Sequence, residues 1–159
     1  MKYFLTTLLL IAVLTTFGQT VKNYTLQDMD NANVSLYDLK GEKITILDFW
    51  TTWCRPCKKA IPELSKLYEE YSQQGVQIIG VNCDGPRTVA KVPTVSRGMG
   101  IQYPVLSDIN SEMMNALNYS NFPTLIILDG DFKIQYVHEG FVPGDEIEIK
   151  QEIEKYLKK

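Results

Sequence analysis

An apolar run that leads into a pair of cysteines constrains this chain more than any other feature. Residues 44–50 read ITILDFW, a nearly continuous apolar run with Asp48 as its one charged residue, which is typical of a strand buried on both faces. Residues 57–71 place apolar side chains at helical spacing, with Lys and Glu on the other side. Between them lies Cys54-Arg55-Pro56-Cys57. We therefore predict that the cysteines lie where a central strand ends and a helix begins.

The rest of the chain predicts an alternation of strands and helices. Upstream we expect a short hairpin within residues 24–34 and one helical turn at 36–39. Downstream we expect a strand at 76–82, a helical stretch within 85–100 interrupted by Pro93, an extended piece at 104–106, a helix at 111–117, a hairpin of 124–128 with 133–137, and a helix at 144–157. A βαβ unit followed by a hairpin predicts an α/β fold with a mixed sheet flanked by helices.

The N-terminus predicts a signal peptide over residues 1–18. Lys2 supplies a positive charge, residues 3–14 are apolar, and residues 16–18 offer small side chains for cleavage. The apolar stretch is shorter than the ~20 residues that span a membrane, although a short uncleaved anchor that tethers the protein stays open as the alternative. We expect one domain over residues 19–159, because a chain of this length has little room for a second.

The spacing of the two cysteines suits disulfide exchange. Cysteines three positions apart across a helix start can bring their sulfurs within bonding range, with Cys54 pointing outward and Cys57 shielded. Free N–H groups at the helix start, its dipole and the charge of Arg55 favour a thiolate at Cys54. Pro56 suits an early helical position because it has no N–H to leave unpaired. We therefore expect Cys54 to attack a substrate disulfide and Cys57 to resolve the mixed disulfide.

A zinc site is the alternative that a CxxC motif leaves open. Zinc needs four ligands, and the remaining Cys83 and His138 lie far apart without a second pair. We therefore expect no metal, and no cofactor other than the redox-active disulfide itself. Cys83 is interpreted as a small buried hydrophobic residue, with a regulatory or resolving thiol as the alternative. We expect His138 at the surface.

Two segments carry a resemblance to a known family. The stretch LDFWTTWCRPCKKAIPEL (residues 47–64) resembles the active-site segment of thioredoxins, and residues 121–124, NFPT, are similar to their cis-proline loop. The lead-in before Gly41, the WCxPC core and an insertion at 104–117 make the chain similar to the TlpA/ResA-like branch. This resemblance implies a thioredoxin fold with an added N-terminal hairpin and a strand–helix insertion.

The resemblance also implies roles for residues around the cysteines. Pro123 is expected to be cis and to face the pair, and the Phe122 backbone to pair with an extended substrate segment. Trp53, together with Arg55 and Pro56, is expected to contact the substrate. An ordinary trans proline that opens a strand is the alternative at residue 123.

Asp48 matches the buried acid of thioredoxins. Burial raises the pKa of a carboxyl group, so we expect Asp48 to accept a proton from Cys57 during resolution. A purely structural, hydrogen-bonded Asp is the alternative. Many ResA-like proteins instead carry an amide at this position and a Glu three residues after the second cysteine, where this chain has Ala60. We interpret this difference to mean that Asp48 performs the acid–base role that the Glu has in those proteins.

The whole sequence thus predicts an exported, periplasmic thiol–disulfide oxidoreductase that acts on protein substrates through Cys54 and Cys57. We expect a monomer working as a reductase, with electrons from a membrane thiol donor, and cytochrome c maturation as a pathway implied by the resemblance. A disulfide-forming oxidant and a redox-inactive binding module remain as alternatives. A peroxidase lacks support because Leu47 stands where peroxiredoxins need proline. A net charge of -3 without a basic stripe argues against nucleic-acid partners.

Overall fold

The computed structural model describes residues 18–158, whose centre is a mixed seven-stranded sheet. The strands are β1 (Thr25–Asp28), β2 (Asn33–Ser35), β3 (Ile44–Trp50), β4 (Val76–Asn82), β5 (Val105–Ser107), β6 (Thr124–Asp129) and β7 (Ile134–Glu139). The helices are α1 (Arg55–Tyr71), α2 (Val92–Gly98), α3 (Glu112–Ala116) and α4 (Asp145–Leu157), with 3₁₀ turns at Leu36–Leu39, Ser72–Gln74 and Val89–Lys91.

The sheet order is β2-β1-β5-β4-β3-β6-β7, which places β3 well inside the sheet. β3 pairs in parallel with β4 and antiparallel with β6, and β6 continues antiparallel to β7. The predicted α/β fold with a mixed sheet is therefore confirmed, as are the N-terminal hairpin of β1 and β2 and the inserted β5 and α3.

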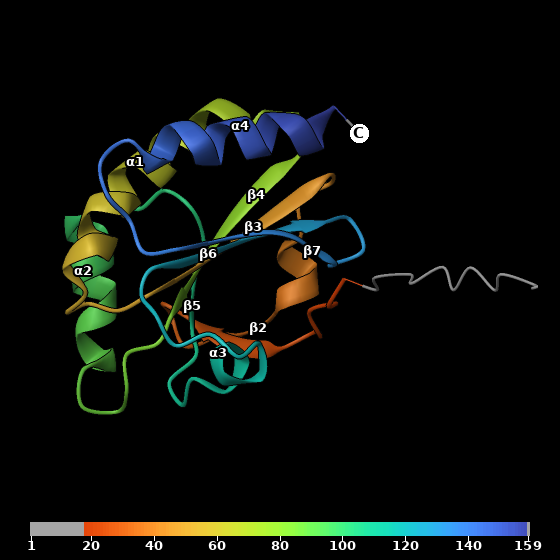
Figure 1. The fold of residues 1–159 in the computed structure, drawn as a ribbon. Coiled ribbons are helices and arrows are strands. Elements are labelled where there is room, and N and C mark those ends of the chain that lie inside the picture. Colours follow the sequence, from red (N-terminus) through yellow and green to blue (C-terminus); the bar gives the residue numbers. More distant parts are fainter. Residues whose placement is uncertain (1–17, 159) are drawn as a thin grey trace, which may run out of the picture.

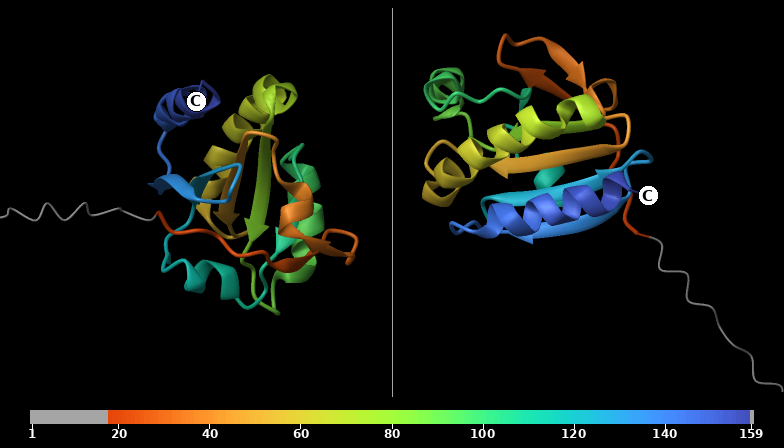
Figure 2. Two further views of the ribbon diagram at one scale, coloured as in Figure 1. Left: turned by 90° about the vertical axis from the view of Figure 1, so that its right-hand side faces the viewer. Right: turned by 90° about the horizontal axis from the view of Figure 1, so that it is seen from above.

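Two hydrophobic layers enclose β3, all seven residues of which are buried. Ile44 and Ile46 face the cluster formed with α1 and α4, whereas Leu47 and Phe49 face the cluster formed with α3. Figures 1 and 2 show α1 and α4 together on one face of the sheet and α3 on the other. Because side chains alternate between the two faces of a strand and both faces are covered, apolar residues are needed at nearly every position of β3.

The N-terminal segment of the described chain joins the sheet before β1 begins. Thr20 bridges Lys133, the Val21 N–H donates to Phe132 O at 2.8 Å, and Val21 is fully buried. Residues 1–17, which carry nearly all of the predicted signal peptide, lie outside the described residues. Within residues 18–158 no helix is long and apolar enough to cross a membrane.

Two local expectations are corrected. Pro93 does not interrupt a helix but occupies the second position of α2, where a missing N–H leaves no intrahelical bond unmade. His138 is not a surface residue, since its side chain is only 15% exposed. Its Nε2 lies 3.0 Å from Asp145 Oδ2 and its Nδ1 lies 3.2 Å from the Tyr136 hydroxyl, so α4 covers the ring.

Gly41 provides a test of the packing at the start of β3. A Cβ there would lie 2.8 Å from Gln77 N and 2.9 Å from Gly75 O, and it would overlap Ile44 O. Because these are backbone atoms, we expect Gly41→Ala to lower the free energy of unfolding by about 2 kcal/mol in urea denaturation. Gly98→Ala is the control, since no atom lies within 4 Å of its added Cβ. Equal stability of the two variants would contradict this account.

Candidate active site

The two cysteines lie where the sequence predicts them. Cys54 and Cys57 form a disulfide, and their Cα atoms are 5.3 Å apart. Cys54 is the N-cap of α1, and its Sγ accepts a hydrogen bond from Cys57 N at 3.1 Å. Arg55 and Pro56 occupy the first two positions of that helix. One backbone donor of the helix start is therefore already directed at the sulfur of Cys54.

The two cysteines are packed among apolar side chains, and the residues of this region differ in how much of their surface is exposed to solvent. Cys54 retains 5% of its surface and Cys57 none, whereas Trp53 is 63% exposed. The buried side chains packed with the cysteines are Trp50, Ile61, Val92 and Val105, and the partly buried ones are Met29, Val89, Val95, Met99, Ile101 and Phe122. This order of exposure matches the expectation that Cys54 is the accessible sulfur, and the fully buried Trp50 contributes to core packing.

The cis-proline loop lies beside the motif. The peptide bond between Phe122 and Pro123 is cis, as the resemblance implies. The rings of Trp53 and Phe122 meet edge-on with centroids 5.9 Å apart, and Phe122 also packs against the cysteine cluster. Gly140 N donates to Pro123 O at 2.7 Å, which attaches the loop to the segment that follows β7.

Asp48 lies on the face of β3 that α1 covers, between Ile46 and Trp50 on that face. Its side chain is fully buried, and its Oδ2 accepts a hydrogen bond from the Tyr103 hydroxyl at 3.2 Å. Its Oδ1 has no hydrogen-bond partner among the described residues. Burial raises the pKa of Asp48 to about 7, against the opposing effect of Tyr103. Near neutral pH the group therefore exists in both protonation states.

Tyr103 is a residue that the sequence analysis missed. Tyr103 comes just before β5, and β5 pairs with β4, which in turn pairs with β3. The contact between Tyr103 and Asp48 therefore depends on strand pairing between segments far apart in the sequence. Gly80 is opposite Asp48 in the β3–β4 register, and a Cβ on it would be 3.2 Å from Tyr103 Cε2 and 3.3 Å from Trp50 Nε1. Gly80, a glycine inside an apolar strand, was the sequence signal that could have indicated close packing of bulky side chains at this point.

Cys83 belongs to a different part of the molecule from the disulfide. It is buried in the cluster on the α3 side of the sheet, with Sγ 4.0 Å from Asp108 Oδ2. Burial, with the Asp108 charge second, raises the pKa of its thiol, which agrees with the interpretation as a small buried residue. Among residues 18–158 no group of three or more His, Cys, Asp or Glu side chains is placed to hold a metal.

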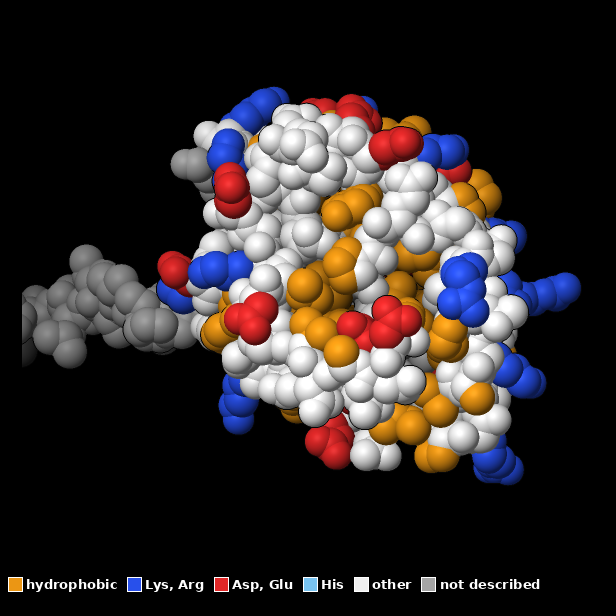
Figure 3. All heavy atoms as spheres, turned by 180° about the vertical axis from the view of Figure 1, so that it is seen from behind, with side chains coloured by type: hydrophobic (Ala, Val, Ile, Leu, Met, Phe, Trp, Pro, Cys, Tyr) orange, Lys and Arg blue, Asp and Glu red, His pale blue; other side chains and the backbone are white. Residues whose placement is uncertain are grey.

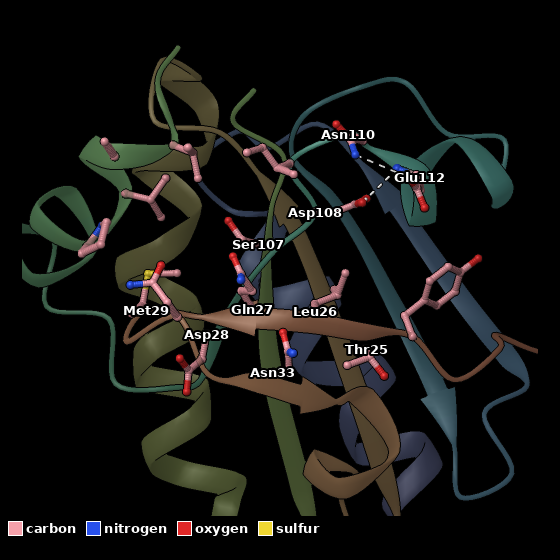
Figure 4. A pocket seen from close by; sticks show the side chains of 17 residues that line it. Thr25, Leu26, Gln27, Asp28, Met29, Asn33, Ser107, Asp108, Asn110 and Glu112 are labelled. Carbon is pink, nitrogen blue, oxygen red and sulfur yellow. Dashed lines mark hydrogen bonds between the residues drawn. The ribbon is translucent and has the colours of Figure 1, made fainter. Parts of the chain in front are cut away.

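A groove of about 640 Å³ borders the apolar surround of the cysteines. It lies between the β1–β2 hairpin, the start of α2 and the segment that leads into α3, and Figure 4 shows Leu26, Gln27 and Ser107 among its lining residues. Met29, Val89 and Val92 line the groove and also pack with the cysteine cluster. Figure 3 shows hydrophobic side chains gathered around a hollow on the face turned away in Figure 1.

Comparison with known proteins decides the family. The model of the AhpC/TSA family matches residues 17–137, most of the described chain. The chain belongs to this family. Two curated relatives are the thiol-disulfide oxidoreductases ResA of Geobacillus thermodenitrificans, 30% identical over 86% of this chain and 76% of the relative, and of Bacillus subtilis, 33% identical over 77% and 67%.

A solved structure supports the same assignment. A candidate DsbE-type thiol:disulfide interchange protein from Chlorobium tepidum superposes with a TM-score of 0.80 at 25% identity, covering 88% of this chain and 96% of its own. The predicted thioredoxin fold and the ResA-like branch are confirmed, and so is the enzyme class, thiol–disulfide oxidoreductase.

Asp48 predicts how stability depends on pH. Its pKa is about 7 in the folded protein against an ordinary value of 3.8, so the folded state holds the proton through this window and stability falls as pH rises. Asp48→Asn has no ionisable group at this position, so the variant does not lose this stability as pH rises. We expect urea denaturation to give the variant an advantage of up to about 4 kcal/mol at pH 8 that vanishes near pH 4. An advantage independent of pH would contradict the assignment.

Proposed function

We propose that this chain is an extracytoplasmic enzyme that reduces disulfides in protein substrates, with Cys54 as nucleophile and Cys57 as resolving thiol. The observation that carries this is the hydrogen bond from Cys57 N to Cys54 Sγ at the start of α1. When the pair is reduced, that N–H and the helix dipole stabilise a thiolate on Cys54, the more exposed sulfur. The charge of Arg55 in the first turn acts in the same direction.

The first half of the reaction joins enzyme and substrate. The Cys54 thiolate attacks one sulfur of the substrate disulfide, a mixed disulfide forms, and the other substrate sulfur leaves as a thiolate. Trp53, Phe122 and Pro123, with the outer side of Arg55 and Pro56, form the contact surface for this complex. An extended substrate segment pairs with the Phe122 backbone, as the resemblance implies.

The second half releases the reduced substrate. Cys57 is fully buried, so its thiol needs a local acceptor for its proton. Asp48 lies on the β3 face that α1 covers, and with a pKa of about 7 it can take this proton at neutral pH. The Cys57 thiolate then attacks the Cys54 sulfur and displaces the second substrate thiolate. Two electrons have passed to the substrate, and the enzyme holds the Cys54–Cys57 disulfide.

The proposed cellular setting is supported by the predicted leader and by the resemblance. The predicted signal peptide over residues 1–18 supports export to the periplasm, where no general system keeps thiols reduced. A membrane thiol donor then returns the enzyme to its reduced form. Cytochrome c maturation is the pathway that the ResA-like resemblance suggests, and we propose that the protein acts as a monomer.

Three variants test the assigned roles with insulin and dithiothreitol as the assay. Cys54→Ser is expected to abolish turnover, and Cys57→Ala to accumulate a mixed disulfide that gel electrophoresis without reductant detects. Asp48→Asn is expected to slow resolution about 10²-fold at pH 7, because it removes the proton acceptor. Turnover of Cys54→Ser equal to that of the parent would indicate a redox-inactive binding module instead.

Tyr103→Phe is the matched variant for Asp48. It removes the hydrogen bond that opposes the rise in the pKa of Asp48, but it leaves the carboxyl group in place. The pH at which exchange reaches half its maximum is therefore expected to move upward, with the maximal rate retained. An unchanged profile in both variants would remove Asp48 from the mechanism.

The direction of electron flow is tested by the reduction potential of the Cys54–Cys57 pair. Equilibration with glutathione is expected to give a value near that of thioredoxin, about -270 mV, as suits a reductase. A value near that of DsbA, about -120 mV, would identify a disulfide-forming oxidant.

A further inference from the structure

The turn that joins β3 to α1 determines where the sulfur of Cys54 lies. Residues 51–54 make this turn, and Cys54 N donates to Thr51 O at 3.2 Å. The hydrogen bond from Cys57 N to Cys54 Sγ is 3.1 Å long, and a shift of the turn would lengthen and weaken it. Whatever fixes this turn therefore also fixes the N–H donor against the sulfur.

Asp84, just beyond the end of β4, holds the turn at two points. Its Oδ2 accepts from Thr52 N at 2.6 Å, and its Oδ1 accepts from the Thr52 hydroxyl at 2.7 Å. Asp84 is fully buried, and Thr52 is 8% exposed. Both the backbone and the side chain of the residue two places before Cys54 are thus bound to one carboxylate.

The carboxylate is itself held in place. Asn82 Nδ2 donates to Asp84 Oδ2 at 2.9 Å, and Asp84 N donates back to Asn82 Oδ1 at 3.0 Å. Cys83 N donates to Trp50 O at 2.9 Å, which joins the ends of β3 and β4. Burial alone would raise the pKa of Asp84, but the hydrogen bonds, those of Thr52 foremost, outweigh it and hold the pKa below its ordinary value. The bonds to Thr52 are therefore charge-assisted at neutral pH.

We propose that Asp84 is a positioning residue for disulfide exchange, which acts through Thr52 to hold Cys54 against the first N–H groups of α1. The inference rests on the proposed role of Cys54 as nucleophile. It predicts that loss of the Asp84–Thr52 bonds weakens the support of the Cys54 thiolate and lowers its reactivity, even in a protein that remains folded.

The test is the rate at which iodoacetamide alkylates Cys54 in the fully reduced protein at pH 7. Thr52→Val keeps the shape of the side chain but loses the hydroxyl donor, and we expect it to slow alkylation at least fivefold. Thr52→Ser keeps the donor and is expected to stay within twofold of the parent. The pH midpoint of the alkylation rate is expected to rise in Thr52→Val alone.

Asp84→Asn separates positioning from charge. Removal of a negative charge near a thiol would by itself lower the pKa of the thiol and speed alkylation at pH 7. A neutral amide can contact Thr52 only through uncharged bonds, which are weaker than the charge-assisted bonds of the carboxylate. We therefore expect Asp84→Asn to slow alkylation, and faster alkylation would overturn the proposal.

Asp108→Asn is the matched control for a merely structural effect. Asp108 is also buried and accepts backbone N–H bonds, at 2.9 Å from Glu112, 3.1 Å from Met113 and 3.2 Å from Met114, but it caps α3. We expect this variant to lower the melting temperature without changing the alkylation rate. If Asp84→Asn and Thr52→Val behaved like Asp108→Asn, the proposal would be wrong. A parent protein unable to reduce a small disulfide would instead contradict the proposed function.

Discussion

Burial of β3 on both faces is the constraint on which the rest of the molecule depends. Two hydrophobic layers press on this strand, and hydrogen bonds to β4 and β6 fix its edges, so its end at Trp50 has little freedom to move. The reactive sulfurs follow within seven residues of that end. Their placement therefore depends on a strand that is buried on both faces, where a shift would disturb many contacts at once.

Two buried acids near the cysteines differ in charge state because their partners differ. Within residues 18–158 Asp48 has one hydrogen-bond donor, Tyr103, and desolvation dominates, so the group can exchange a proton near neutral pH. Asp84 has donors from Thr52 and Asn82, which compensate its charge and keep it ionised. The number of donors thus separates a group suited to moving a proton from one suited to holding a loop.

Features encoded locally could be predicted from the sequence, and features made by distant contacts could not. The nearly continuous apolar run of β3 and the cysteine spacing at the start of α1 sufficed to place the disulfide. The partners of Asp48 and Thr52 were not foreseen, because they depend on how β4 and β5 lie beside β3. The prediction that His138 lies at the surface was wrong for a similar reason, because α4 returns over β7 and its Asp145 contacts the ring of His138.

The pairing of residues 19–21 with residues 132–134, where β7 begins, has a consequence for protein engineering. Gln19 O accepts from Ile134 N at 2.9 Å, and Val21 is part of the core. Residues directly after the predicted cleavage point therefore take part in backbone pairing and in the core. A fusion partner or affinity tag should join upstream of Gln19. Trimming the chain to β1 would remove the buried side chain of Val21 and the backbone pairing of residues 19–21 with the β6–β7 hairpin.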